Sequence, residues 1–197
     1  YLLYSSVRDG KQSDIYKYTL NTKTTTQFTK TAESEYSPTF MPDGKNISVV
    51  MVEKDSVQRL WKYPIVGGTP SLMMPTIDSI GYHCWINRDS VALVMITNPP
   101  TLEIASVLTQ KHRKVDTNVG RCMFSVSPGT LDFVEKKDST HFELCNYDRT
   151  SKELKKNFCT LPSEDFAFMF FSEPLYLYGN GAKISGYFLF QKKEKLL

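Results

Sequence analysis

Residues 37–54 read SPTFMPDGKNISVVMVEK, a turn between two extended segments. Gly44 can adopt the positive φ that a tight hairpin turn needs, and Pro42 stiffens the approach to it. Beyond the turn, Ile47 to Val52 is apolar and rich in β-branched residues, which favours a strand. The stretch therefore predicts a β-hairpin.

The same pattern recurs along the chain. An aromatic residue, a short polar or turn segment and an apolar run follow one another at four places, with spacings of 45, 39 and 44 residues. A further run of strand character lies in each unit, and alternation with period two is clear in the first two of these runs. The repeated aromatics are Phe40, Trp85, Phe124 and Phe168, and the further runs begin at Ile15, Leu60, Leu102, Phe142 and Ile184.

Four short strands in every 40 to 45 residues are typical of a propeller blade. A β-sandwich would not explain why a whole four-strand pattern repeats. We therefore predict an all-β protein, a β-propeller of four-stranded antiparallel blades, with the repeated aromatics packed between neighbouring blades. The predicted units are 1–33, 34–78, 79–117, 118–162 and 163–197. The first lacks its first strand and the last stops near its third or fourth, so we expect four to five blades of a larger ring.

The composition excludes several classes of function. Net charge is only +3, from 24 basic and 21 acidic residues, so a nucleic-acid surface is not implied. No run of 18 apolar residues occurs, so no membrane span is expected. Four cysteines lie at 84, 122, 145 and 159 without a C-x-x-C pair. They favour free, mostly buried thiols over zinc ligands, although their even number also permits disulfides.

Several segments resemble the repeat of TolB-type six-bladed propellers. The matching residues are Asp14-Ile15-Tyr16, Phe28-Thr29, Ser37-Pro38-Thr39-Phe40 and Pro42-Asp43-Gly44-Lys45. Segments 79–96 and 163–190 are similar to degenerate copies that have lost the Pro-Asp-Gly turn. The likeness is greatest to secreted or periplasmic TolB-like proteins of Bacteroidetes-type bacteria. It implies a six-bladed ring and a place outside the cytoplasm, but the repeat by itself carries no activity.

Motifs for catalysis are absent from the sequence. There is no G-x-S-x-G elbow, no phosphate-binding glycine loop and no H-E-x-x-H zinc motif. The three histidines lie far apart, at 83, 112 and 141. We therefore assign no catalytic residue, no metal site and no cofactor.

One set of polar and aromatic residues precedes the innermost strands at equivalent positions of the repeat. Propeller symmetry would bring equivalent positions to one mouth of the central channel, where they could bind a ligand or peptide. Two alternatives remain open: polar residues at a solvated rim need no partner, and Glu35, His83 and Asp165 could hold a metal. The set comprises Glu35, Tyr36, Tyr82, His83, Arg121, Glu164 and Asp165.

The sequence favours a non-enzymatic, monomeric propeller that binds a protein, a peptide or an envelope component, in the periplasm or outside the cell. The alternative is a propeller domain accessory to a hydrolase, such as a prolyl-oligopeptidase-like peptidase or an amidohydrolase, whose catalytic domain lies outside this chain. A second candidate surface is the aromatic face of the strands around Tyr16, Tyr18, Trp61 and Tyr63. These residues either pack against the next blade or form a protein-docking surface.

Overall fold

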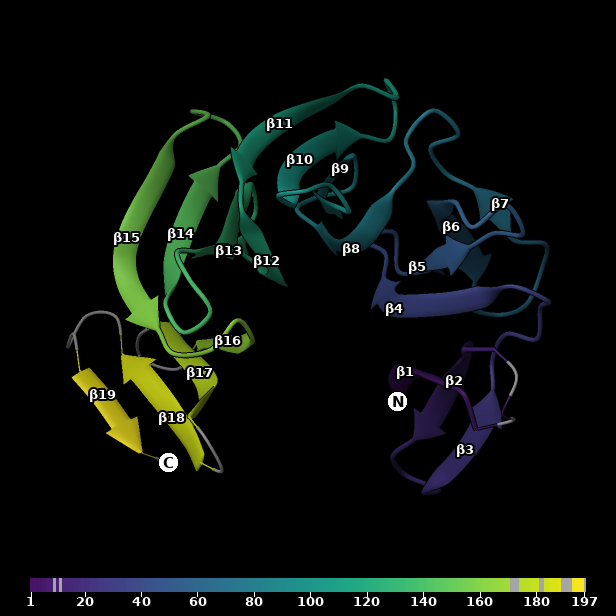
Figure 1. The fold of residues 1–197 in the computed structure, drawn as a ribbon. Helices are drawn as coiled ribbons and strands as arrows, with labels where there is room; N and C mark the ends of the chain where they lie inside the picture. Colours follow the sequence, from purple (N-terminus) through teal and green to yellow (C-terminus); the bar gives the residue numbers. More distant parts are fainter. Residues whose placement is uncertain (9, 11, 171–173, 181–182, 189–192, 197) are drawn as a thin grey trace. The chain divides into compact units, whose positions relative to one another are not determined.

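The computed structural model describes residues 1–8, 10, 12–170, 174–180, 183–188 and 193–196. These residues form five antiparallel sheets (Figure 1), so the predicted all-β fold class is confirmed. The chain divides into two compact units, Tyr1–Ile96 with Ile104–Arg113, and Thr97–Glu103 with Lys114–Leu197. Within the described part of the chain, no helix is long and apolar enough to cross a membrane.

Strands that follow one another in sequence are neighbours in every sheet. The first sheet has three strands, β1 (Leu2–Ser6), β2 (Asp14–Thr19) and β3 (Thr24–Gln27). The second has β4 (Ser34–Phe40), β5 (Asn46–Val52), β6 (Gln58–Pro64) and β7 (Ser71–Leu72). The third has β8 (Ile80–Trp85), β9 (Ser90–Met95), β10 (Thr101–Ser106) and β11 (His112–Thr117). The fourth has β12 (Val119–Ser127), β13 (Thr130–Lys136), β14 (Phe142–Asp148) and β15 (Leu154–Leu161). The fifth has β16 (Phe166–Phe170), β17 (Pro174–Asn180), β18 (Lys183–Phe188) and β19 (Lys193–Leu196).

The hairpin between β4 and β5 forms as the sequence predicts. Gly44 has a φ of 67°, in the left-handed region. Asp43 Oδ1 accepts hydrogen bonds from the backbone N–H groups of Lys45 and Asn46, at 2.8 and 3.0 Å. The Asp43 carboxylate thus closes the turn that pairs β4 with β5.

Strand β5 is buried on both faces, which explains its almost continuous apolar sequence. Alternate residues Ile47, Val49 and Met51 belong to a cluster with Ile15 of the first sheet. Val50 points the other way, into a second cluster. That second cluster contains Leu60, Met74, Ile77, Ile80, Trp85, Val91, Leu93, Met95 and Ala105.

The second unit has its own core between the fourth and fifth sheets. Its members come from strands β13 to β17, so it joins residues distant in sequence. The cluster contains Val134, Phe142, Leu144, Cys159, Leu161, Phe166, Tyr176 and Tyr178. All four cysteines are thiols rather than disulfides, as expected, with Cys145 and Cys159 buried and the other two half-buried.

The repeated aromatics are not equally buried. Trp85 lies in the core, and Phe124 and Phe168 are half-buried against the cluster of the second unit. Phe40, however, is 47% exposed, so the prediction that it fills a layer between blades is wrong. It ends β4, where the ring of Tyr1 covers it edge-on with centroids 5.4 Å apart.

Candidate functional site

The first strands of three sheets are irregular where the candidate site residues lie. The pairing register shifts in β4 between Tyr36 and Thr39, and in β8 between Ile80 and Tyr82. It also shifts early in β12, before Met123. Bulges of this kind bend a strand and re-aim its side chains. Glu35 and Tyr36 pair regularly just before the shift in β4, and so point to opposite faces. Tyr82 and His83 pair regularly just after the shift in β8, and they too point to opposite faces.

Glu35 is fully buried and serves the interior of the first unit. Its carboxylate accepts hydrogen bonds from the hydroxyls of Thr29, Thr31 and Tyr63, the last two at 2.7 and 2.8 Å from Oε1. Burial raises the pKa of Glu35, and these hydrogen bonds oppose the rise. The side chain thus fastens the linker between β3 and β4 to strand β6.

His83 is also enclosed. Its Nε2 lies 2.7 Å from the hydroxyl of Ser48, which accepts a hydrogen bond of 2.9 Å from Trp85 Nε1. Burial lowers the pKa of His83 to about 4, so the ring is neutral at physiological pH. Ser48 is fully buried, so this serine–histidine pair has no access to a substrate and joins β5 to β8 instead.

Tyr36 and Tyr82 are the two candidate residues of the first unit that face solvent. They are 40% and 39% exposed, and both line a groove of about 370 Å³. Ser5, Gln58 and Ile96 contribute to its wall. The groove therefore offers two aromatic rings with hydroxyl groups beside polar and apolar side chains, a surface suited to a polypeptide.

Arg121, Glu164 and Asp165 contact one another in the second unit. Arg121 Nε and Nη2 donate to the two oxygens of Asp165 at 2.9 and 2.6 Å. Glu164 Oε1 accepts from the backbone N–H of Arg121 at 2.8 Å, and its Oε2 lies 2.9 Å from Lys136 Nζ. The hydrogen bonds from Arg121 lower the pKa of Asp165 despite partial burial. Each charge here is balanced by a neighbour.

The exposed Arg121–Asp165 pair should contribute little stability. Both side chains are about half exposed, and such pairs typically contribute about 0.2–1 kcal/mol. We expect Arg121→Ala to lower the free energy of unfolding by less than about 1 kcal/mol in urea titrations. A double-mutant cycle with Asp165→Ala isolates the pair, and a coupling well above that value would contradict this assignment.

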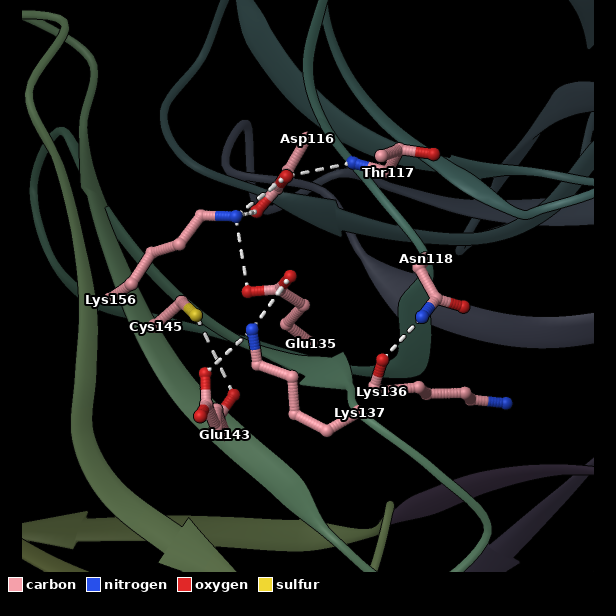
Figure 2. Close-up of polar contacts among 9 residues, drawn as sticks. All are labelled: Asp116, Thr117, Asn118, Glu135, Lys136, Lys137, Glu143, Cys145 and Lys156. Carbon is pink, nitrogen blue, oxygen red and sulfur yellow. Dashed lines mark hydrogen bonds and ion pairs between the residues drawn. The ribbon is translucent and has the colours of Figure 1, made fainter.

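A chain of alternating charges in the second unit was not predicted from the sequence (Figure 2). Lys156 Nζ lies 2.8 Å from Asp116 and 3.0 Å from Glu135, and Lys137 Nζ lies 3.1 Å from Glu135 and 3.0 Å from Glu143. Burial tends to raise the pKa of Glu135, but its bonds to the two lysines hold it below its usual value. Each carboxylate of this chain of charges thus faces a lysine ammonium group. No group of three or more metal-ligating side chains is found among the described residues.

One signal for this chain of charges was available in the sequence but was not decisive. Glu135 and Lys137 are two residues apart and so share a face of the chain, as period two requires. Their partner Lys156, however, is about twenty residues further on, and Asp116 is 40 residues from Lys156. Pairing at that distance follows from the packing of strands, not from a local pattern.

Comparisons with known proteins find similarity at the level of structure only. No family model matches the sequence, and no curated protein matches it. The structure is similar to TolB from Acinetobacter baumannii, with a TM-score of 0.75 and 11% identity over 99% of this chain and 52% of that chain. It is also similar to a chain of a nidogen/laminin complex, with a TM-score of 0.70 and 10% identity over 100% and 76% of the two chains. A third similar structure is puromycin hydrolase, with a TM-score of 0.60 and 11% identity over 85% of this chain and 29% of that chain.

These similarities concern the fold, because the identities are low. The chain spans about half the length of the TolB structure that it matches. Five antiparallel sheets of consecutive strands and the match over nearly the whole chain agree with the repeat seen in the sequence. The protein is a β-propeller with a TolB-like fold.

Proposed function

We propose that this chain is a non-enzymatic propeller that binds another protein or a peptide. The observation that carries the proposal is the pair of half-exposed tyrosines, Tyr36 and Tyr82, in one groove on neighbouring first strands β4 and β8. Tyrosine gives a large contact area at low entropic cost and is enriched at polypeptide interfaces. In this proposal the protein acts in the periplasm or outside the cell, as the TolB-like repeat implies.

The other site residues have supporting parts in this proposal. Glu35 and His83 hold the backbone beneath the two tyrosines, through contacts to β6 and β5 respectively. Arg121, Glu164 and Asp165 form a separate, charge-balanced surface in the second unit. The similarity to a chain of a nidogen/laminin complex supports a role in protein binding, since that propeller-like chain belongs to a protein assembly.

The test uses peptides selected on the wild-type chain from a displayed random library. We expect the double variant Tyr36→Ala/Tyr82→Ala to weaken their binding by about tenfold or more, because truncating an aromatic anchor typically costs about 1–2 kcal/mol or more. Phe40→Ala is the matched control, since Phe40 is similarly exposed on the same strand but does not line the groove. Equal binding by both variants would contradict the proposal, and so would substrate turnover by the purified protein that is lost on changing Glu35, His83 or Asp165.

A hydrolase accessory domain is the second candidate. The observation that favours it is the similarity to puromycin hydrolase, in which the matched part is 29% of a longer chain. The propeller domain of a trilobed protease from Pyrococcus furiosus is similar as well, with a TM-score of 0.61. The coding sequence that follows Leu197 discriminates between the candidates: a G-x-S-x-G elbow or a set of metal-ligating histidines there would favour the hydrolase.

A further inference from the structure

A second groove, of about 540 Å³, opens beside strand β6 and shares no lining residue with the Tyr36–Tyr82 groove. Its volume lies within the range of roughly 300–1,000 Å³ usual for ligand sites. Trp61 and Tyr63 are two residues apart on β6 and so lie on one face, next to Met51 of β5. Tyr63 and Met51 are buried, whereas Trp61 is half-buried. The groove thus has an apolar, aromatic floor that the first sheet covers only in part.

The rim of this groove is acidic. Glu33, Glu53 and Asp55 line it together with a single basic residue, Lys54. Glu53 is already engaged, since its oxygens accept from Trp61 Nε1 at 2.9 Å and from Arg59 Nη1 at 2.6 Å. Asp55 is partly engaged as well, since its Oδ2 lies 3.9 Å from Arg59 Nη1, but its side chain is more than half exposed. Glu33 and Asp55 supply the remaining negative charge of the rim.

The floor also lies in a negative field. The Tyr63 hydroxyl donates to Glu35 Oε1 at 2.8 Å, beneath the groove. Burial first, and then the hydrogen bond and the charges of Glu35 and Glu33, raise the pKa of Tyr63. An anionic ligand would be repelled here, and a purely apolar one would leave the rim carboxylates desolvated without a partner.

We propose that this groove binds the side chain of an arginine or lysine in a partner polypeptide. The apolar stem of such a side chain fits against Met51 and the neighbouring Pro70, and its cationic head can lie over the Trp61 ring, near Glu33 and Asp55. The inference rests on the proposed function in one respect, that the partner is a polypeptide. Its residues are distinct from Tyr36 and Tyr82, so the two sites can be tested separately.

The probe is an acetylated, amidated pentapeptide with arginine between pairs of glycines, compared with the same peptide carrying citrulline, which is similar in shape but uncharged. The chain has two tryptophans, and since Trp85 is 7% exposed, a change in fluorescence reports on Trp61. We expect a saturable change with the arginine peptide and binding weaker by about fivefold to tenfold with the citrulline peptide. Equal responses to the two peptides, or no saturable response, would overturn the proposal.

Variants locate the interaction. Glu33→Gln and Asp55→Asn should each weaken binding of the arginine peptide by about threefold to fivefold without changing the urea unfolding curve. Glu153→Gln, which removes a carboxylate that is exposed in the second unit, is the matched control and should bind as the wild type does. The Tyr36→Ala/Tyr82→Ala variant should also bind the arginine peptide normally, because the two grooves share no lining residue. The arginine site can therefore be confirmed even if the Tyr36–Tyr82 groove binds no peptide. Unchanged binding in both acidic variants would overturn the site.

Discussion

Gly120→Ala should lower the free energy of unfolding by about 1–3 kcal/mol, although it adds a single methyl group. A Cβ at this position would overlap Val134 Cγ2 and lie 2.9 Å from Glu164 Cγ. Gly120 and Val134 are both buried, so neither can yield toward solvent. Glu164 is held by its contacts to Arg121 and Lys136, which would have to break or shift. The packing of the second unit therefore requires glycine, which has no side chain, at position 120.

Thermal and urea unfolding measure this effect, and Gly179→Ala is its control. Gly179 also lies in a strand, β17, but a Cβ there would meet no atom within 4 Å. For a chain of this size the expected loss corresponds to a decrease in Tm of about 2–4 °C per kcal/mol. If the two alanine variants were equally stable, the close approach of β12 to Glu164 would not exist in solution.

The strands and the turn were predictable because their signals are local. The Asp-Gly turn at residues 43–44 and the alternation along β2 and β6 need only a few neighbouring residues to be recognised. The same holds for β5, whose apolar run indicates burial on both faces. Fold class followed from the repetition of these local patterns, not from any single one of them.

The candidate site was predictable only as a set of positions. Glu35 and Tyr36 are adjacent in β4 and so point to opposite faces, with Glu35 buried and Tyr36 half-exposed. Likewise, His83 is buried, whereas the adjacent Tyr82 is half-exposed. Alternation predicts that the two neighbours point in opposite directions. Which of them turns inward depends on partners such as Tyr63 and Ser48, which come from other strands. Those partners cannot be identified from the sequence of the segment itself.

Acidification from pH 6.5 to 4 should destabilise the protein through His83. Its pKa is about 4 in the folded chain, against 6.5 for an exposed imidazole. Between these values the unfolded chain binds a proton that the folded chain does not, so the free energy of unfolding falls as the pH falls. Complete passage through this window corresponds to a loss of about 3 kcal/mol. The cause is the burial of the ring between Ser48 and the core around Trp85.

Urea unfolding at pH 7 and pH 4.5 should therefore show a smaller difference for His83→Gln than for the wild type. Glutamine can still hydrogen-bond to Ser48 but does not titrate. Other groups act in this range: the raised pKa of Glu35 favours the folded state on acidification, and the lowered pKa of Glu135 opposes it. Both are present in each variant, so they cancel when the two differences are compared. An unchanged difference in His83→Gln would mean that the ring is not enclosed between β5 and β8.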